Sequence, residues 1–183
     1  MPLPFDPIAE AHRQWLMRWP AHAEHMAAVT SVMRVQQMLI GEIDRALKPY
    51  GLTFASYEAL RLLAFTRDGE LPMGKIGERL MVHPASVTNT VDKLERAGMV
   101  RRRTAEEDRR RVLAAITADG RELVEKATAT LNAANFALAG IDTQTAVALT
   151  ALLRTVRERG NDFDSGAHDP WASGRGAGDS DQP

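Results

Sequence analysis

The sequence contains no cysteine. This absence excludes disulfide bonds, thiolate metal sites, cysteine catalysis and regulation by thiol oxidation. No segment approaches the roughly 18 consecutive apolar residues that a membrane-spanning helix requires. The first ten residues, MPLPFDPIAE, lack the basic start and the apolar run of a signal peptide. We therefore expect a cytoplasmic protein.

A strong excess of charge of either sign is also missing. The 23 basic and 24 acidic residues give a formal net charge of −1, so bulk charge does not predict binding to nucleic acid. Hydrophobic residues make up 44% of the 183 residues, and this length suits one domain with appendages. Any case for a charged partner must therefore rest on a local patch.

Positive charge is concentrated in one short segment. Six arginines lie between residues 101 and 111, in RRRTAEEDRRR. The flanking segments MVRRR (99–103) and RVLAAIT (111–117) have the composition of short β-strands, and Val112, Ala114 and Ile116 would share a face. We therefore expect a β-hairpin with arginines at its tip.

The rest of the chain has mostly helical periodicity. Helices are expected over residues 6–19, 25–48, 53–66, 72–80, 84–97, 118–138 and 142–160. One face of the second helix is apolar, and its residues are Met26, Val29, Met33, Ile40, Ile43 and Leu47. RDGELP (67–72) is expected to be a loop, and the Gly-, Asp-, Ser- and Pro-rich residues 161–183 to be disordered.

Helix-start and helix-stop residues support these boundaries. Thr53, Thr117 and Asp142 are suited to N-cap positions. Pro84 suits the first position of a helix, and Gly98 suits the position just beyond its end.

The helix at 84–97 has two different sides. Its inward side is apolar and consists of Val87, Val91 and Leu94. Its outward side carries short hydrogen-bonding side chains and one lysine, namely Ser86, Thr88, Asn89 and Lys93. Such side chains can read base edges in a major groove, and asparagine pairs well with adenine. Taken alone, this side could equally be solvated surface, but the short helix and the three-residue turn before it favour a helix-turn-helix.

The arginine hairpin would then form a wing beside that helix. Arg110, next to Arg109, could enter the adjacent minor groove, where the potential is most negative when the groove is narrow. Asp108 could orient the Arg110 guanidinium through a charge-assisted hydrogen bond. The alternative is a solvated turn whose charges neutralise each other.

These segments together resemble the MarR family of winged helix-turn-helix regulators. The matching motifs are LTFASYEALRLLA (52–64), MGKIGERLMVHPASVTNTVDKLERAGMVRR (73–102) and EEDRRRVLAAITADGREL (106–123). The resemblance implies an obligate homodimer whose two winged domains read a pseudo-palindrome. It also implies that Ser86, Thr88 and Asn89 contact DNA, with Arg110 in the minor groove. His83 stands at an N-cap where the family often has serine.

The resemblance further implies release from DNA by a small, aromatic or anionic ligand. The cleft would lie among helices 25–48, 53–66 and 118–138. Its candidate lining residues, each of which could instead be core or surface, are Met26, Met33, Arg34, Gln37, Tyr57 and Arg61. His22 and His25 lie three apart, but two histidines do not make a metal site, and we expect no metal or cofactor.

We conclude that the chain is mainly α with a small β-hairpin wing. A winged helix-turn-helix domain (52–117) would join an N-terminal extension (1–24) and dimerisation helices (25–50 and 118–160). The function expected is a ligand-responsive DNA-binding regulator, most simply a repressor, and the alternative is a helical scaffold that does not bind DNA. The chain has no glycine-rich phosphate loop, metal-ligand cluster or activated nucleophile, so no enzyme is expected.

Overall fold

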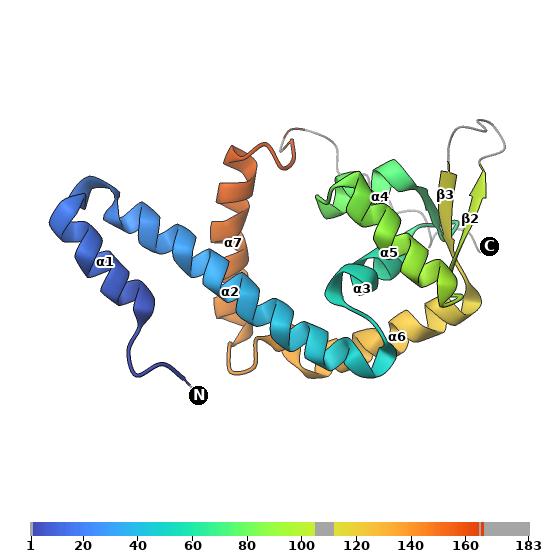
Figure 1. The fold of residues 1–183 in the computed structure, drawn as a ribbon, viewed down its shortest axis with the longest axis horizontal. Helices are drawn as coiled ribbons and strands as arrows, with labels where there is room; N and C mark the ends of the chain where they lie inside the picture. Colours follow the sequence, from blue (N-terminus) through green and yellow to red (C-terminus); the bar gives the residue numbers. More distant parts are fainter. Residues whose placement is uncertain (1, 105–111, 165, 167–183) are drawn as a thin grey trace, which may run out of the picture. The chain divides into compact units, whose positions relative to one another are not determined.

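The computed structural model describes residues 2–104, 112–164 and 166. Contacts divide the chain into two units, Met1–Ala139 and Gly140–Pro183. The helices of the first unit are α1 Pro7–Arg18, α2 Ala23–Leu47, α3 Phe54–Phe65, α4 Met73–Leu80, α5 Pro84–Arg96 and α6 Ala118–Ala133 (Figure 1). Its strands are β1 Glu70–Pro72, β2 Val100–Thr104 and β3 Val112–Ile116, and its 3-10 turns are η1 Pro20–His22, η2 Lys48–Tyr50 and η3 Asn135–Ala137. The second unit contains α7 Thr143–Arg159.

Side-chain caps begin the helices where the sequence predicts them. The Thr53 hydroxyl accepts from the backbone N–H of Ser56, which completes a reciprocal capping box at the start of α3. The Thr117 hydroxyl accepts from the Gly120 N–H at 3.0 Å. His83 does cap α5, because its Nδ1 accepts from the Ala85 N–H at 3.2 Å. These caps satisfy N–H groups that the first helical turn leaves unpaired.

The sheet has three strands rather than the two of a simple hairpin. Its order is β1-β3-β2, and both pairings are antiparallel. Residues 67–72, expected to form a loop, therefore include a strand: Glu70 pairs with Ala115 and Pro72 with Leu113. A three-residue edge strand is too short to show alternation, and a distant segment stabilises it. Strand β3 is therefore central in the sheet, and its residues Leu113 through Ile116 are all buried.

The end of α6 also differs from the prediction. The apolar pattern continues to Leu138, but the helix ends at Ala133. Asn135, Phe136 and Ala137 have positive φ angles of 47°, 49° and 64°, which an α-helix cannot contain. The chain turns here, so that Ala137 packs against the hydrophobic core.

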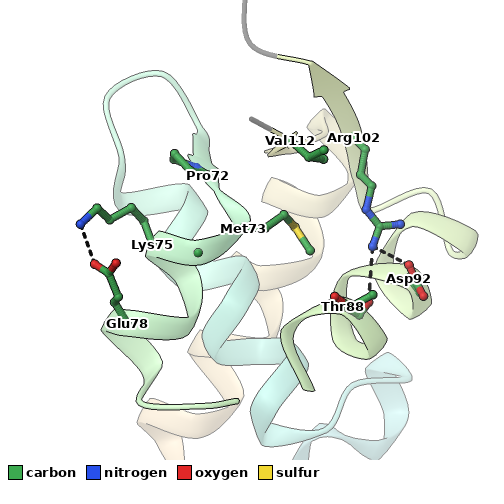
Figure 2. Close-up of a pocket in the computed structure, with 9 residues that line it drawn as sticks. Pro72, Met73, Lys75, Glu78, Thr88, Asp92, Arg102 and Val112 are labelled. Atoms are coloured by element: carbon green, nitrogen blue, oxygen red, sulfur yellow. Dashed lines mark hydrogen bonds and ion pairs between the residues drawn. The ribbon is translucent and has the colours of Figure 1, made fainter. Parts of the chain in front are cut away.

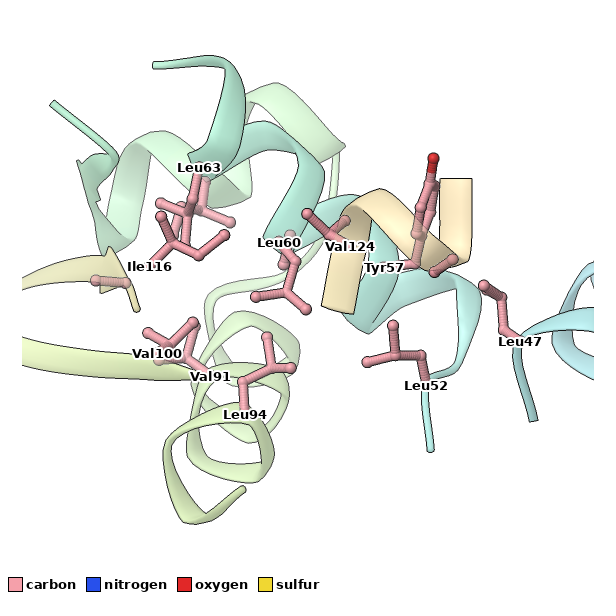
Figure 3. Packing of buried hydrophobic residues seen from close by; sticks show 14 of the residues in the cluster. Leu47, Leu52, Tyr57, Leu60, Leu63, Val91, Leu94, Val100, Ile116 and Val124 are labelled. Atoms are coloured by element: carbon pink, nitrogen blue, oxygen red, sulfur yellow. The ribbon is translucent and has the colours of Figure 1, made fainter. Parts of the chain in front are cut away.

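The core of the first unit surrounds α3. Leu60 and Leu63 are fully buried, and they pack with apolar side chains of α2, α5, α6 and the sheet (Figure 3). The inward side predicted for α5 is confirmed, since Val87, Val91 and Leu94 are all buried. Helix α5 is therefore packed into the core of the unit through three of its side chains.

The apolar face of α2 changes character along its length. Ile43 and Leu47 are buried in the core, whereas Val29 and Met33 are 58% and 56% exposed within the single chain. The extension α1 packs beside the first half of α2 (Figure 1), and His12 Nε2 lies 2.8 Å from Glu24 Oε1. In the second unit, α7 buries none of its residues. Within the described ranges, no helix combines the length and apolarity that would let it cross a bilayer.

Candidate nucleic-acid interface and ligand cleft

A close crossing of α4 and α5 builds the helix-turn-helix. Met81 adopts the left-handed conformation and ends α4, and Pro84 starts α5 three residues later. A Cβ placed on Gly77 would lie 3.2 Å from the Val82 carbonyl oxygen and 3.3 Å from Val87 Cγ2. Glycine therefore lets the turn lie directly against α4, which sets the angle at which α5 projects.

The outward side of α5 lies at the surface. Ser86, Thr88, Asn89 and Lys93 are all exposed. The Thr88 hydroxyl donates to the Pro84 carbonyl at 3.1 Å, which satisfies its donor while leaving an oxygen lone pair available. The structure thus presents these four predicted contact residues on one free surface. Their role toward DNA stays a prediction.

Arg102 joins this helix to the wing, and sequence reasoning missed it. Its Nη1 donates to Glu95 Oε2 at 2.7 Å, its Nη2 pairs with Asp92, and its backbone N–H donates to Glu95 Oε1 at 2.9 Å. The same guanidinium approaches the Thr88 carbonyl at 3.4 Å (Figure 2). Partial burial alone would lower the pKa of Arg102, but Asp92 and Glu95 outweigh it and raise that pKa. Strand β2 is therefore tied to α5 by a permanently charged group.

An open groove lies between these elements. Its volume is about 740 Å³, and Figure 2 shows α4, α5 and the two wing strands around it. The lining residues are Pro72, Met73, Gly74, Lys75, Glu78, Thr88, Asp92, Arg102 and Val112. Lys75 pairs with Glu78 at 2.6 Å, so the groove presents paired rather than isolated charges.

The residues predicted for the wing tip, Asp108, Arg109 and Arg110, lie outside the described residues. The strands on either side are described, and Thr104 pairs with Val112 at the tip end of the hairpin. The minor-groove role of Arg110 and the orienting role of Asp108 therefore stay predictions.

A second cavity lies on the side of α3 that faces α6. Its volume is about 530 Å³, and it is lined by Phe54, Tyr57, Glu58, Arg61, Leu62, Phe65, Leu80, Thr128, Asn132 and Phe136. Two of the six predicted ligand residues, Tyr57 and Arg61, are among them. The other four, Met26, Met33, Arg34 and Gln37, lie along α2 and do not line this cavity.

Arg61 is engaged by neighbouring groups. Its Nη1 donates to Glu125 at 2.7 Å and its Nη2 to the Val124 carbonyl at 2.9 Å. The guanidinium lies 5.2 Å from the centre of the Phe65 ring, within the range of a cation–π contact. Burial alone would lower the pKa of Arg61, but the hydrogen bond to Glu125 raises it overall.

Glu58 differs from Arg61 in having no such partner. It is half-buried in the cavity wall, and no hydrogen bond or ion pair joins it to another described residue. Burial accordingly raises the pKa of its carboxyl group. Sequence reasoning missed this residue, because a single glutamate on an amphipathic helix is ordinarily solvated.

These features define a winged helix-turn-helix protein with a ligand-sized cavity beside α3. The MarR family pattern matches residues 52–112. Sco5413, a MarR family transcriptional regulator from Streptomyces coelicolor, is 55% identical, with a TM-score of 0.73, and the match covers 78% of this chain and 99% of Sco5413. The chain therefore belongs to the MarR family of transcriptional regulators.

Of two further relatives, one is named as a repressor and the other was solved with a bound ligand. The HTH-type transcriptional repressor Rv2887 of Mycobacterium tuberculosis is 33% identical over 102 residues, which are 56% of this chain and 72% of that repressor. CouR from Rhodococcus jostii RHA1, solved bound to p-coumaroyl-CoA, is 28% identical with a TM-score of 0.62, covering 75% of this chain and 92% of CouR. The chain spans only about half the length of another curated regulator that it matches, 54% in that case.

Proposed function

We propose that this protein is a cytoplasmic, DNA-binding transcriptional repressor that binds a pseudo-palindromic operator as a homodimer and is released by a small molecule. The observation that carries the proposal is the exposed polar side of α5, held beside the wing by Arg102. A helix of this kind enters the major groove, and the wing then meets the neighbouring minor groove. The repressor name of the relative Rv2887 supports the direction of regulation.

Exposed apolar residues on two helices support the homodimer. On α2 they are Val29, Val32, Met33, Val35 and Met38, and on α7 they are Val147, Leu152 and Val156. Single exposed apolar side chains are ordinary, but a series along one helix marks a surface that another chain covers. A second copy with two-fold symmetry would cover these residues and present two α5 helices to DNA.

The cavity beside α3 supports release by a ligand. It has the size of a small-molecule site and combines aromatic walls with a few polar groups. The ligand in the CouR structure, p-coumaroyl-CoA, shows that a relative takes up an aromatic compound.

The test is binding of the full-length protein to a duplex selected from a random pool. Counterion release makes affinity fall steeply with salt, and each phosphate contact contributes about 1 to the slope. Arg110→Ala should weaken binding and lower that slope by about 1, while sedimentation shows an unchanged dimer. A scaffold that does not bind DNA would select no duplex, and the variant would behave as the wild type.

A further inference from the structure

The cavity beside α3 has an unbalanced charge. Arg61 is neutralised by Glu125 and covered by Phe65. The Nε of Arg61 has no hydrogen-bond partner among the described residues, but it is buried and therefore out of reach of a ligand in the cavity. Glu58 is the only acidic residue of the lining and is itself unpaired within the described chain. A ligand entering the cavity therefore meets a negative charge.

The remaining walls are suited to an aromatic cation. Four aromatic residues line the cavity, namely Phe54, Tyr57, Phe65 and Phe136. Phe54 and Tyr57 stack with their ring centres 6.4 Å apart. Aromatic faces attract cations as well as apolar rings, whereas a carboxylate gains nothing from them. The unpaired carboxylate and the aromatic walls therefore favour the same class of ligand.

We propose that the effector of this protein is an aromatic compound carrying a positive charge, such as an aryl-alkyl amine, which pairs with Glu58. The proposal rests on the proposed function, in which this cavity is the effector site. It departs from the anionic ligands that the family resemblance implies. The class follows from the side chains that are present, because a carboxylate ligand would bring a second negative charge beside Glu58.

The position of Glu58 also connects the cavity to the DNA-reading helix. Glu58 and Leu80 also line a smaller space between α3, α4 and α5, together with Ser86 and Val87. A cation that draws the Glu58 side chain toward the larger cavity removes it from the wall beneath the start of α5. Occupancy of the cavity would therefore alter the support of the recognition helix.

Three probes with the same aromatic body but different charge test the proposal. They are 2-naphthylmethylamine, 2-naphthalenemethanol and 2-naphthoate, measured by calorimetry on the full-length protein near neutral pH. The amine should bind about tenfold more tightly than the alcohol, and the naphthoate more weakly than both. Glu58→Gln should remove the preference for the amine and leave the affinity for the alcohol within about twofold. Glu122→Gln, the same change at an exposed position outside the cavity lining, should keep the preference.

The possible results separate this proposal from the proposed function. Tighter binding of naphthoate, an amine preference that survives Glu58→Gln, or no binding of any probe would each overturn the cationic class. DNA binding is measured separately on the selected duplex, with and without each probe. If the wild type binds that duplex and naphthoate releases it, the repressor proposal stands and only the ligand class fails. If no duplex is bound, the proposed function itself fails.

Discussion

Replacing Arg102 with methionine tests whether the connection between the wing and α5 contributes to stability and to DNA binding. Methionine keeps the apolar stem of the side chain but removes the charge that pairs with Asp92 and Glu95. The Arg102 side chain is 26% exposed, and the two carboxylates are 40% and 37% exposed, so both ion pairs are partly screened. At about 0.5–1 kcal/mol for each pair, the free energy of unfolding should fall by about 1–2 kcal/mol.

The same substitution should also weaken DNA binding. Without Arg102, two uncompensated carboxylates stand on α5, beside the groove where phosphates would approach. We expect the affinity for a selected duplex to fall at least about tenfold, a loss of about 1.4 kcal/mol. Fluorescence anisotropy measures this affinity, and urea unfolding measures the stability of the same sample.

A charge rescue distinguishes the repulsion by the two carboxylates from the loss of the Arg102 guanidinium itself. Adding Asp92→Asn and Glu95→Gln to Arg102→Met removes the repulsion without restoring the guanidinium. If neutralisation of the carboxylates is the role of Arg102, the triple variant should recover most of the lost affinity. Wild-type affinity in the Arg102→Met single variant would show that Arg102 does not support DNA binding.

Two further predictions concern the core and the cavity. Leu60→Ala removes a fully buried side chain from the centre of the core and should cost about 2–5 kcal/mol in urea unfolding; a loss below about 1 kcal/mol would contradict the packing described. Burial raises the pKa of Glu58 above its value in the unfolded chain. The folded protein is therefore more stable at acid pH, where Glu58 is protonated, and it loses this stability as pH rises through the folded pKa. Glu58→Gln should therefore raise the melting temperature at neutral pH by a small amount, since the group is partly exposed, and this gain should vanish below the unfolded pKa. Calorimetry at the two pH values checks it, and a gain of equal size at both would show that Glu58 does not titrate as described.

Local chemistry in the sequence predicts much of the fold. Thr53, His83 and Thr117 cap helices through groups within three residues, so their roles can be inferred without knowledge of the fold. The division of α5 into buried and exposed sides follows from helical period alone.

Features that depend on distant residues were not predicted. Strand β1 exists because β3 pairs with it, and α6 ends early because the chain turns back onto the core. In the sequence Arg102 is one of a run of arginines, and its partners Asp92 and Glu95 lie on another element. The importance of Glu58 likewise depends on the aromatic residues that surround it in space.

Asn89→Ala tests whether the outward side of α5 reads DNA sequence. The measurement is the ratio of affinities for a selected duplex and a scrambled duplex of the same length at one salt concentration. Loss of a base contact should reduce this ratio by about 5- to 150-fold, which corresponds to about 1–3 kcal/mol, and should leave scrambled binding nearly unchanged. An unchanged ratio, with the fold and the dimer intact, would contradict the account.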